Sequence, residues 1–203
     1  AQKDSRIIVI HKPNGGLVSA RKAGVSASHG KYIGYVDGDD WIEPDFYEKM
    51  YEPVQSKHAD VVAAGYTRDI EDVGEKILNH VPVGFYEGDR RNILYGSLVC
   101  AGEYFFFGVY SYVWNKLFRR ELLYDCQMDI DDRIFVGEDV LCTFSTMMKA
   151  DRISVIDNTS YHYRQRTGSI LKMLENQEQE NQRIEILHQE IKRYLDTSAY
   201  QDI

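Results

Sequence analysis

The order of the first segments constrains the fold of this chain most. Residues 7–10 form a β-branched run that ends at the turn-forming residues 13–16, which predicts a buried strand and a loop. Residues 17–28 carry apolar side chains at helical spacing, with Gly30 after them, and predict a helix. Residues 32–36 predict a second strand. Strand, helix and strand in this order describe one right-handed crossover of a parallel sheet, so we expect an α/β fold.

The later segments continue this alternation. The polar tail, residues 172–195, has Ile184, Leu187, Ile191 and Tyr194 at helical spacing and predicts one long amphipathic helix packed on the surface rather than a coiled coil. We therefore divide the chain into a domain of residues 1–171 and a C-terminal helix within residues 172–203. The other predicted elements are a helix opened by residues 43–45, a strand at 60–66, a hairpin at 67–83, helices at 87–100 and 137–150, and strands at 153–156 and 160–164.

Composition excludes several classes of protein. A length of 203 residues suits one hydrophobic core, and 43% hydrophobic with 28% charged residues is not the composition of a disordered chain. The net charge of −8, without a long basic run, excludes a nucleic-acid partner. The three cysteines have no metal-binding or disulfide spacing, which indicates a reducing, cytoplasmic compartment. No run approaches the roughly 18 apolar residues of a membrane span.

An acidic cluster follows the strand at residues 32–36. Asp37 and Asp39 are two residues apart, and alternate side chains of an extended chain share one face. Two carboxylates at the carboxyl end of a strand can hold Mg²⁺ or Mn²⁺ in the crevice where α/β sheets bind ligands. The competing interpretation is a simple turn, because Asp and Gly are common turn residues. The cluster alone leaves both interpretations open.

Several short segments occur in the same order as in one known family. Together they make the chain resemble the family-2 glycosyltransferases, which implies a GT-A fold: an α/β, Rossmann-like mixed sheet that binds nucleotide-diphosphate sugars. Ordered agreement of several motifs is more specific than any one of them. The segments are Asn-Gly-Gly-Leu at 14–17, Ser-Ala-Arg at 19–21, Gly-Lys-Tyr-Ile at 30–33, Asp-Gly-Asp-Asp-Trp at 37–41, Val-Trp-Asn-Lys-Leu-Phe at 113–118, Gly-Glu-Asp at 137–139, Tyr-His-Tyr-Arg-Gln-Arg at 161–166 and Gly-Ser-Ile at 168–170.

The resemblance implies a metal site for the donor. Mn²⁺ or Mg²⁺ would bridge the diphosphate of a nucleotide-sugar, with a UDP-sugar as the expected donor. Asp39 is the first candidate for metal contact, and Asp37 for the ribose or a metal-bound water. Asp40 would support the turn. His162 is a possible third metal ligand, since imidazole suits Mn²⁺, although a packed histidine is the alternative.

Further donor contacts follow from the resemblance. Arg21 corresponds to the family's nucleotide-contacting arginine, but Lys22 stands where the family has Asn. Arg164 and Arg166 carry guanidinium groups that suit diphosphate oxygens, with structural ion pairs as the alternative. The other donor residues implied are Asn14 and Gly15, in the loop before the first helix.

The resemblance also implies the acceptor side. Asp139 would be the base that takes the proton of the acceptor hydroxyl, and Glu138 would orient it or touch the acceptor. Acids are also expected in the first turn of a helix after Gly137, for reasons unrelated to catalysis. Trp114 is a candidate for stacking on the acceptor, against plain burial. Direct attack on an α-linked donor inverts the anomeric carbon and gives a β-linkage.

Two features of the family are missing from this chain. Its first two strands, which end in a Pro-x-Tyr-Asn loop and an Asp-Asp-Gly-Ser turn, do not precede residue 7. We therefore expect an N-terminally truncated sheet whose open edges lead the chain to self-associate, or an N-terminal segment in a position unlike the family's. The usual setting of similar chains implies a glycan or lipid-linked acceptor at the inner membrane face, and the aromatic residues 104–112 are a candidate for peripheral membrane contact.

Two other classes of function stay open. One is a non-catalytic carbohydrate-binding or interaction module with a degenerate donor site, which the missing strands and Lys22 favour. The other is a metal-dependent phosphohydrolase of the haloacid-dehalogenase type, which also places Asp-x-Asp after a strand. That class continues with Gly-Thr, whereas this chain continues with Asp40-Trp41.

Overall fold

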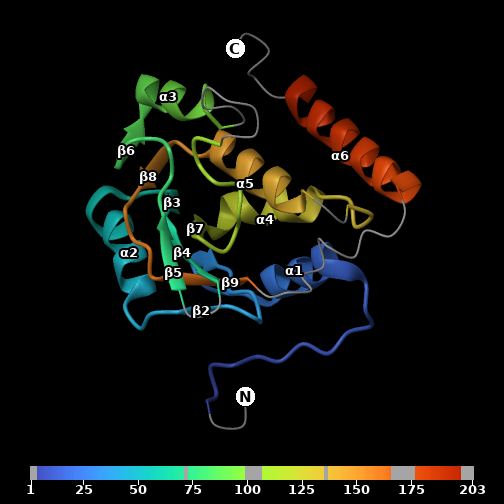
Figure 1. Cartoon of the computed structure of the whole chain (residues 1–203), viewed down its shortest axis with the longest axis horizontal. Coiled ribbons are helices and arrows are strands. Elements are labelled where there is room, and N and C mark those ends of the chain that lie inside the picture. The colour runs from blue at the N-terminus through green and yellow to red at the C-terminus, as the bar shows by residue number, and fades with distance from the viewer. Residues whose placement is uncertain (1–3, 71–72, 99–106, 135–136, 166–176, 198–203) are drawn as a thin grey trace.

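A computed structural model describes residues 4–70, 73–98, 107–134, 137–165 and 177–197. It is a mixed α/β structure built on two sheets (Figure 1). In the larger sheet β3 and β8 are parallel, and all other neighbours are antiparallel. Its strands, in spatial order, are β1 (Tyr32–Gly34), β7 (Lys116–Arg119), β3 (Val61–Ala63), β8 (Arg152–Val155) and β6 (Gly84–Glu87).

The smaller sheet positions the acidic cluster. In it β4 and β9 are parallel, while the other two pairs of neighbours are antiparallel. The β4 and β5 pair is the hairpin predicted within residues 67–83. The strand predicted at 60–66 is divided between the two sheets. The order is β2 (Trp41–Ile42), β9 (Tyr161–Gln165), β4 (Tyr66–Ile70) and β5 (Val73–Ile77).

Strand β3 shows how the larger sheet divides the core. Val61 and Ala63 belong to one buried cluster and Val62 to a second, because successive side chains of a strand point to opposite faces. The first cluster receives buried residues of the helices α1 (Gly16–Ala27), α4 (Arg120–Asp129) and α5 (Glu138–Lys149). The second receives Phe46, Met50 and Val54, at four-residue spacing on α2 (Phe46–Lys57). Helices therefore cover both faces.

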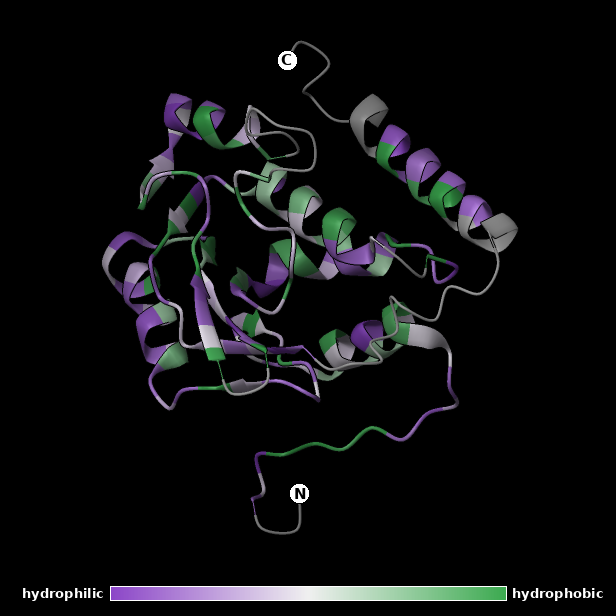
Figure 2. Ribbon diagram, viewed as in Figure 1, coloured by the Kyte–Doolittle hydropathy of each residue, from purple (hydrophilic) through white to green (hydrophobic). Residues whose placement is uncertain are grey.

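The remaining helices lie at the edge of the molecule. A 3-10 turn, η1 (Gly88–Arg90), and α3 (Arg91–Tyr95) form the start of the helix predicted at 87–100. The C-terminal helix α6 (Gln177–Thr197) alternates polar and apolar side chains and lies beside α5 (Figure 2). Within the described ranges, no helix combines the length and apolar character needed to cross a bilayer.

The predicted strand at residues 7–10 is wrong. These residues form an extended segment without strand pairing, ahead of α1 (Figures 1 and 2), and Ile7, Ile8, Val9 and Ile10 are 44 to 66% exposed. The crossover to a parallel neighbour fails with it, since β1 pairs antiparallel with β7. Local sequence shows that a segment can be a strand, but a strand also needs a partner, and no described segment pairs with this one. Strand β7 and helix α4 were not predicted.

Candidate active site

The acidic cluster forms a turn that is anchored to β9. The backbone N–H of Asp40 donates to the carbonyl of Asp37 at 3.1 Å, so the segment turns and the predicted alternation of an extended strand is wrong. The carboxylate of Asp40 accepts the Tyr161 hydroxyl at 2.8 Å and the Arg164 backbone N–H at 2.9 Å. The Asp37 N–H donates to the same hydroxyl at 3.1 Å. Asp40 therefore fixes the turn through its bonds to β9.

Arg21 joins this turn to the start of α5. It lies on α1 and is only 8% exposed. Its Nη2 is 3.7 Å from Asp37 Oδ1, and its Nη1 is 3.0 Å from Glu138 Oε1 and also hydrogen-bonds Asp139. One buried cation thus contacts carboxylates that are more than a hundred residues apart in sequence. The structure places Arg21 between the predicted donor and acceptor halves of the site.

Negative charge exceeds positive charge around Arg21. Burial raises the pKa of Glu138 above its usual range, and the charge of Asp139 adds to this effect while Arg21 opposes it. Burial also raises the pKa of Asp37, which Arg21 lowers and the neighbouring acids raise. These shifts follow from crowding several acids around one arginine. An added cation would relieve that repulsion.

The acidic turn fits a divalent metal only with help from a ligand. Asp39 is exposed, and its carboxylate makes no hydrogen bond or ion pair to the described residues. The same residues contain no group of three or more His, Cys, Asp or Glu side chains that could hold a metal ion. Mg²⁺ sites commonly use one or two carboxylates with substrate phosphates and water. Asp39 and Asp37, as hard oxygen donors, match that type of site rather than a complete protein cage.

His162 belongs to a different group of side chains. Its Nδ1 is 3.0 Å from Asp69 Oδ2 and its Nε2 is 3.5 Å from Glu43 Oε1. Its ring stacks on Trp41, with the centroids 3.5 Å apart. Both ring nitrogens therefore face carboxylates outside the acidic turn. The structure does not bring His162 to Asp37 or Asp39, so its assignment as a third metal ligand is corrected.

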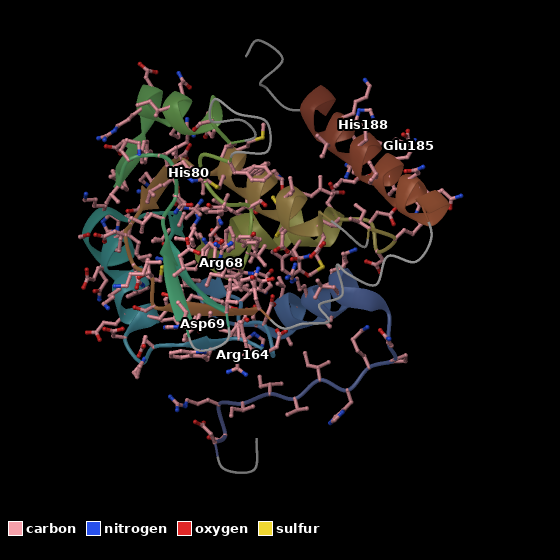
Figure 3. All side chains as sticks on the ribbon, in the orientation of Figure 1. Arg68, Asp69, His80, Arg164, Glu185 and His188 are labelled. Atoms are coloured by element: carbon pink, nitrogen blue, oxygen red, sulfur yellow. The ribbon has the colours of Figure 1, made fainter. Side chains whose placement is uncertain are left out.

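The predicted donor arginines and loop residues are dispersed. Arg164 contributes its backbone N–H to Asp40, and its side chain is exposed on β9, paired in register with Asp69 (Figure 3). Arg166 lies outside the described residues. Asn14 accepts the N–H of Gly16 at 3.1 Å, and Gly15 caps α1. These loop residues shape the start of the helix that carries Arg21, and they make no recorded contact with the acids.

Trp114 is buried beneath the site. It is 3% exposed, and its ring stacks between Tyr112 at 4.7 Å and Tyr161 at 4.4 Å, measured between centroids. A ring covered on both faces cannot stack on a sugar, so the acceptor role expected of Trp114 is corrected to a packing role. Tyr163, 5.6 Å from Trp114, is only partly buried.

Sequence reasoning missed two residues of the site. Tyr161 holds the acidic turn through its hydroxyl, and Lys116 is a fully buried lysine below Tyr112. Both lie inside segments that carried the resemblance, at 161–166 and 113–118. A lysine flanked by Trp, Asn, Leu and Phe was the available signal, because a charged residue in an apolar run is rarely buried without partners.

Comparison with known proteins supports the resemblance to the family-2 glycosyltransferases. Residues 1–114 match the family described as glycosyl transferase family 2. EpsJ of Bacillus subtilis, a glycosyltransferase, is 33% identical over 176 residues, covering 85% of this chain and 49% of EpsJ. The putative glycosyltransferase EpsH of the same organism is 29% identical, covering 85% of this chain and 48% of EpsH. The chain thus spans about half the length of these relatives.

The fold agrees with solved structures. Residues 1–349 of TarS from S. aureus, in complex with UDP-GlcNAc, superimpose with a TM-score of 0.66 at 18% identity, covering 94% of this chain and 50% of that one. This likeness shows a fold of the GT-A type, as the motifs implied. The family match extends over more than half of the chain and includes the acidic turn. The chain belongs to glycosyltransferase family 2.

Proposed function

We propose that this chain forms the catalytic part of an inverting, metal-dependent glycosyltransferase, which moves a sugar from a nucleotide diphosphate to a hydroxyl of a glycan or lipid-linked acceptor. The observation that carries the proposal is Arg21, which contacts Asp37 on the acidic turn and Asp139 at the start of α5. Binding of the donor diphosphate and removal of the acceptor proton both require acidic groups, and the two sets of groups must lie close together.

Asp139 is the group that would take the proton of the acceptor hydroxyl. It lies in the first turn of α5 and is held by Arg21. Glu138 shares that arginine, and burial together with the neighbouring Asp139 raises the pKa of Glu138. No second carboxylate needs to form a covalent intermediate, so a single displacement inverts the anomeric carbon, in line with the geometry of inverting glycoside chemistry.

Asp39, supported by Asp37, would hold Mn²⁺ or Mg²⁺ together with the donor diphosphate. The metal would act as a Lewis acid that stabilises the leaving diphosphate. The excess of acids over Arg21 supports this role, because a diphosphate would otherwise meet net negative charge. UDP-sugars are the first donors to test, since TarS was crystallised with UDP-GlcNAc and with UDP.

A thermal-shift titration tests the donor site. The chain is titrated with UDP-, GDP- and CDP-sugars in the presence of Mn²⁺. At about 100 times the dissociation constant, the cognate donor should stabilise the fold by about 2.7 kcal/mol. Asp39→Ala should remove this stabilisation. The matched control is Asp45→Ala, which removes a half-exposed acid that directly precedes α2 and pairs with Lys49 at 2.7 Å. The donor should stabilise this variant as much as it stabilises the wild type. No stabilisation by any nucleotide-sugar would contradict the proposal.

The rate of turnover tests whether Asp139 is the base. Asp139→Asn keeps the size of the side chain but removes its proton-accepting charge, so kcat should fall by about 100-fold or more with little change in the donor KM. Asp132→Asn, at an exposed acid 2.7 Å from Lys22, is the control. Unchanged turnover in Asp139→Asn would exclude Asp139 as the base.

A further inference from the structure

A stack of aromatic rings leads away from the acidic turn. Tyr161, whose hydroxyl bonds Asp40, stacks on Trp114, and Trp114 stacks on Tyr112. The stack continues to Tyr110, whose centroid is 5.8 Å from that of Tyr112 at an interplanar angle of 9°. Residues 110, 112 and 114 alternate in sequence, so an extended chain places their rings on one side. The acidic turn and residues 110–112 are thus parts of one packed unit.

The backbone of residues 110–112, here called the tyrosine strap, is held by buried side chains. Lys116 Nζ donates to the carbonyls of Tyr110 at 2.5 Å and Tyr112 at 2.6 Å, and Thr143 Oγ1 donates to that of Ser111 at 2.7 Å. Three consecutive carbonyls therefore accept side-chain protons. The third proton of Lys116 goes to Asn115 Oδ1 at 2.8 Å, so every donor of the ammonium group is used.

The strap runs along the part of α5 that carries the base. Thr143 is four residues after Asp139, and residues four apart lie on the same face of a helix. Electrostatic coupling agrees with this placement. Burial is the main cause that raises the pKa of Tyr112, and the charges of Tyr163 and Asp139 add to it. Burial also raises the pKa of Tyr163, and the charges of the acids at positions 37, 39 and 40 add to that shift.

These contacts tie two partly buried tyrosines to the stack that begins at the acidic turn and to the helix that carries Asp139. Tyr112 and Tyr163 are neither fully buried nor fully exposed, and their centroids are 6.4 Å apart. Trp114 and Tyr110 cover the two faces of the Tyr112 ring, so Tyr112 would offer a sugar its ring edge and hydroxyl. A tyrosine combines an apolar ring with a polar tip, which suits the mixed C–H and O–H surface of a sugar. Trp114 and Tyr161 lie beneath them in the stack and fix their orientation.

We propose that the tyrosine strap and Tyr163 form the saccharide-binding wall for the acceptor, and that Lys116 is the positioning residue of this wall. The inference rests on the proposed transferase function. Lys116 would act through the backbone of residues 110–112, without touching either substrate. Its place at 0% exposure, with all three protons bonded, makes the strap a preformed surface.

The ratio of two reaction rates, sugar transfer to an acceptor and hydrolysis of the donor, tests this wall. Hydrolysis of a UDP-sugar without acceptor reports the donor and metal site, and transfer to a panel of methyl glycosides at high concentration reports the acceptor side. Tyr112→Ala and Lys116→Met should each lower the ratio of transfer to hydrolysis by about tenfold or more, because small misplacements of a reactant cost large factors in rate. Hydrolysis should fall by a clearly smaller factor than transfer, because the donor and metal site lies on the acidic turn and the wall would contact only the acceptor.

Two further variants distinguish a local effect on the wall from a general loss of folding. Thr143→Val keeps the shape of the side chain and removes only its bond to Ser111, so it should lower the same ratio by a smaller factor. Lys49→Met, at an exposed lysine of α2, should leave the ratio unchanged.

The outcomes separate the two proposals. A wild-type chain that neither hydrolyses nor transfers any UDP-sugar contradicts the transferase function itself. A chain that hydrolyses its donor but transfers to no methyl glycoside overturns the wall. The wall is also overturned if transfer and hydrolysis fall in parallel in Tyr112→Ala and Thr143→Val, since that is the result of a purely structural role.

Discussion

Glu138 shows how burial and a neighbouring acid act on one residue of the site. It is 8% exposed and bonds Arg21 at 3.0 Å, yet the net effect of burial and Asp139 is to raise its pKa. A carboxyl group whose pKa is higher in the folded than in the unfolded state binds its proton more tightly when folded. The stability that it contributes is therefore present at low pH and is lost as the pH rises through the folded pKa.

Glu138→Gln removes this penalty while keeping a hydrogen-bonding side chain. The variant should exceed the wild type in free energy of unfolding at pH 8, by on the order of 1 kcal/mol, and the difference should shrink towards pH 4.5. Urea unfolding at both pH values measures this. Glu121→Gln, at an exposed acid in the first turn of α4, is the control without such a pH dependence. A Glu138→Gln variant that is less stable than the wild type at pH 8 would show that its bond to Arg21 outweighs burial.

Helix α6 contacts the element that presents the acidic pair. Gly137, the residue before Glu138, has a φ of +85°, and a Cβ built on it would lie 2.5 Å from Cδ2 of Leu187 on α6. Ile186, Leu187 and Ile191 pack against the main core, whereas Ile184, expected on the apolar side, is 54% exposed. Leu187 and Ile191 thus lie on the packed face as predicted, and Ile186 packs there in place of Ile184. A glycine is required at the start of α5 by both its backbone conformation and the neighbouring helix.

Gly137→Ala should lower the free energy of unfolding by about 2 kcal/mol, from left-handed backbone strain and the clash with Leu187. In a Leu187→Ala background the same change should cost less, because the clash is gone and only the strain remains. Denaturant unfolding of the four proteins of this cycle gives the coupling. Gly24→Ala in α1, where a Cβ meets nothing within 4 Å, should instead stabilise the fold by about 0.5 to 1 kcal/mol. Equal costs of Gly137→Ala in both backgrounds would exclude the clash.

At the scale of the molecule, Asp60 joins three strands from distant parts of the sequence. Its buried carboxylate accepts the backbone N–H groups of Asp151 at 3.1 Å and Arg152 at 3.0 Å. It also pairs with Arg119 at the end of β7, at 2.8 Å, and with the guanidinium of Arg152 on β8, at 3.2 Å. Asp60 directly precedes β3, so these bonds fix the centre of the larger sheet. Its role is structural, unlike that of the acids around Arg21.

Asp60→Ala should therefore destabilise the whole fold by about 3 kcal/mol, because buried backbone donors and two arginines lose their shared acceptor. The midpoint of the nucleotide-sugar titration, measured at a temperature where the variant is folded, should not change. Asp151→Asn, whose side chain is 82% exposed, is the control and should stay within about 0.5 kcal/mol of the wild type. A changed midpoint in Asp60→Ala would mean that the sheet and the donor site are coupled.

Local sequence was sufficient for much of the helical framework and for the family. The helices α1, α2 and α5 and the hairpin of β4 and β5 occur close to where residue spacing and turn signals placed them, because such elements depend on side chains a few positions apart. The ordered motifs also gave the GT-A fold. The prediction of a strand failed for residues 7–10, because whether a segment forms a strand depends on a partner strand that its own sequence does not specify.

The acidic turn at residues 37–40 and the acidic pair at 138–139 were visible in the sequence as two separate motifs. Only the tertiary structure decided that Arg21 connects them, that His162 turns to Asp69, and that the ring of Trp114 is covered on both faces. The physical reason is distance along the chain. Composition and periodicity record what each segment favours locally, whereas the partners of a buried charge are fixed only when segments more than a hundred residues apart pack together.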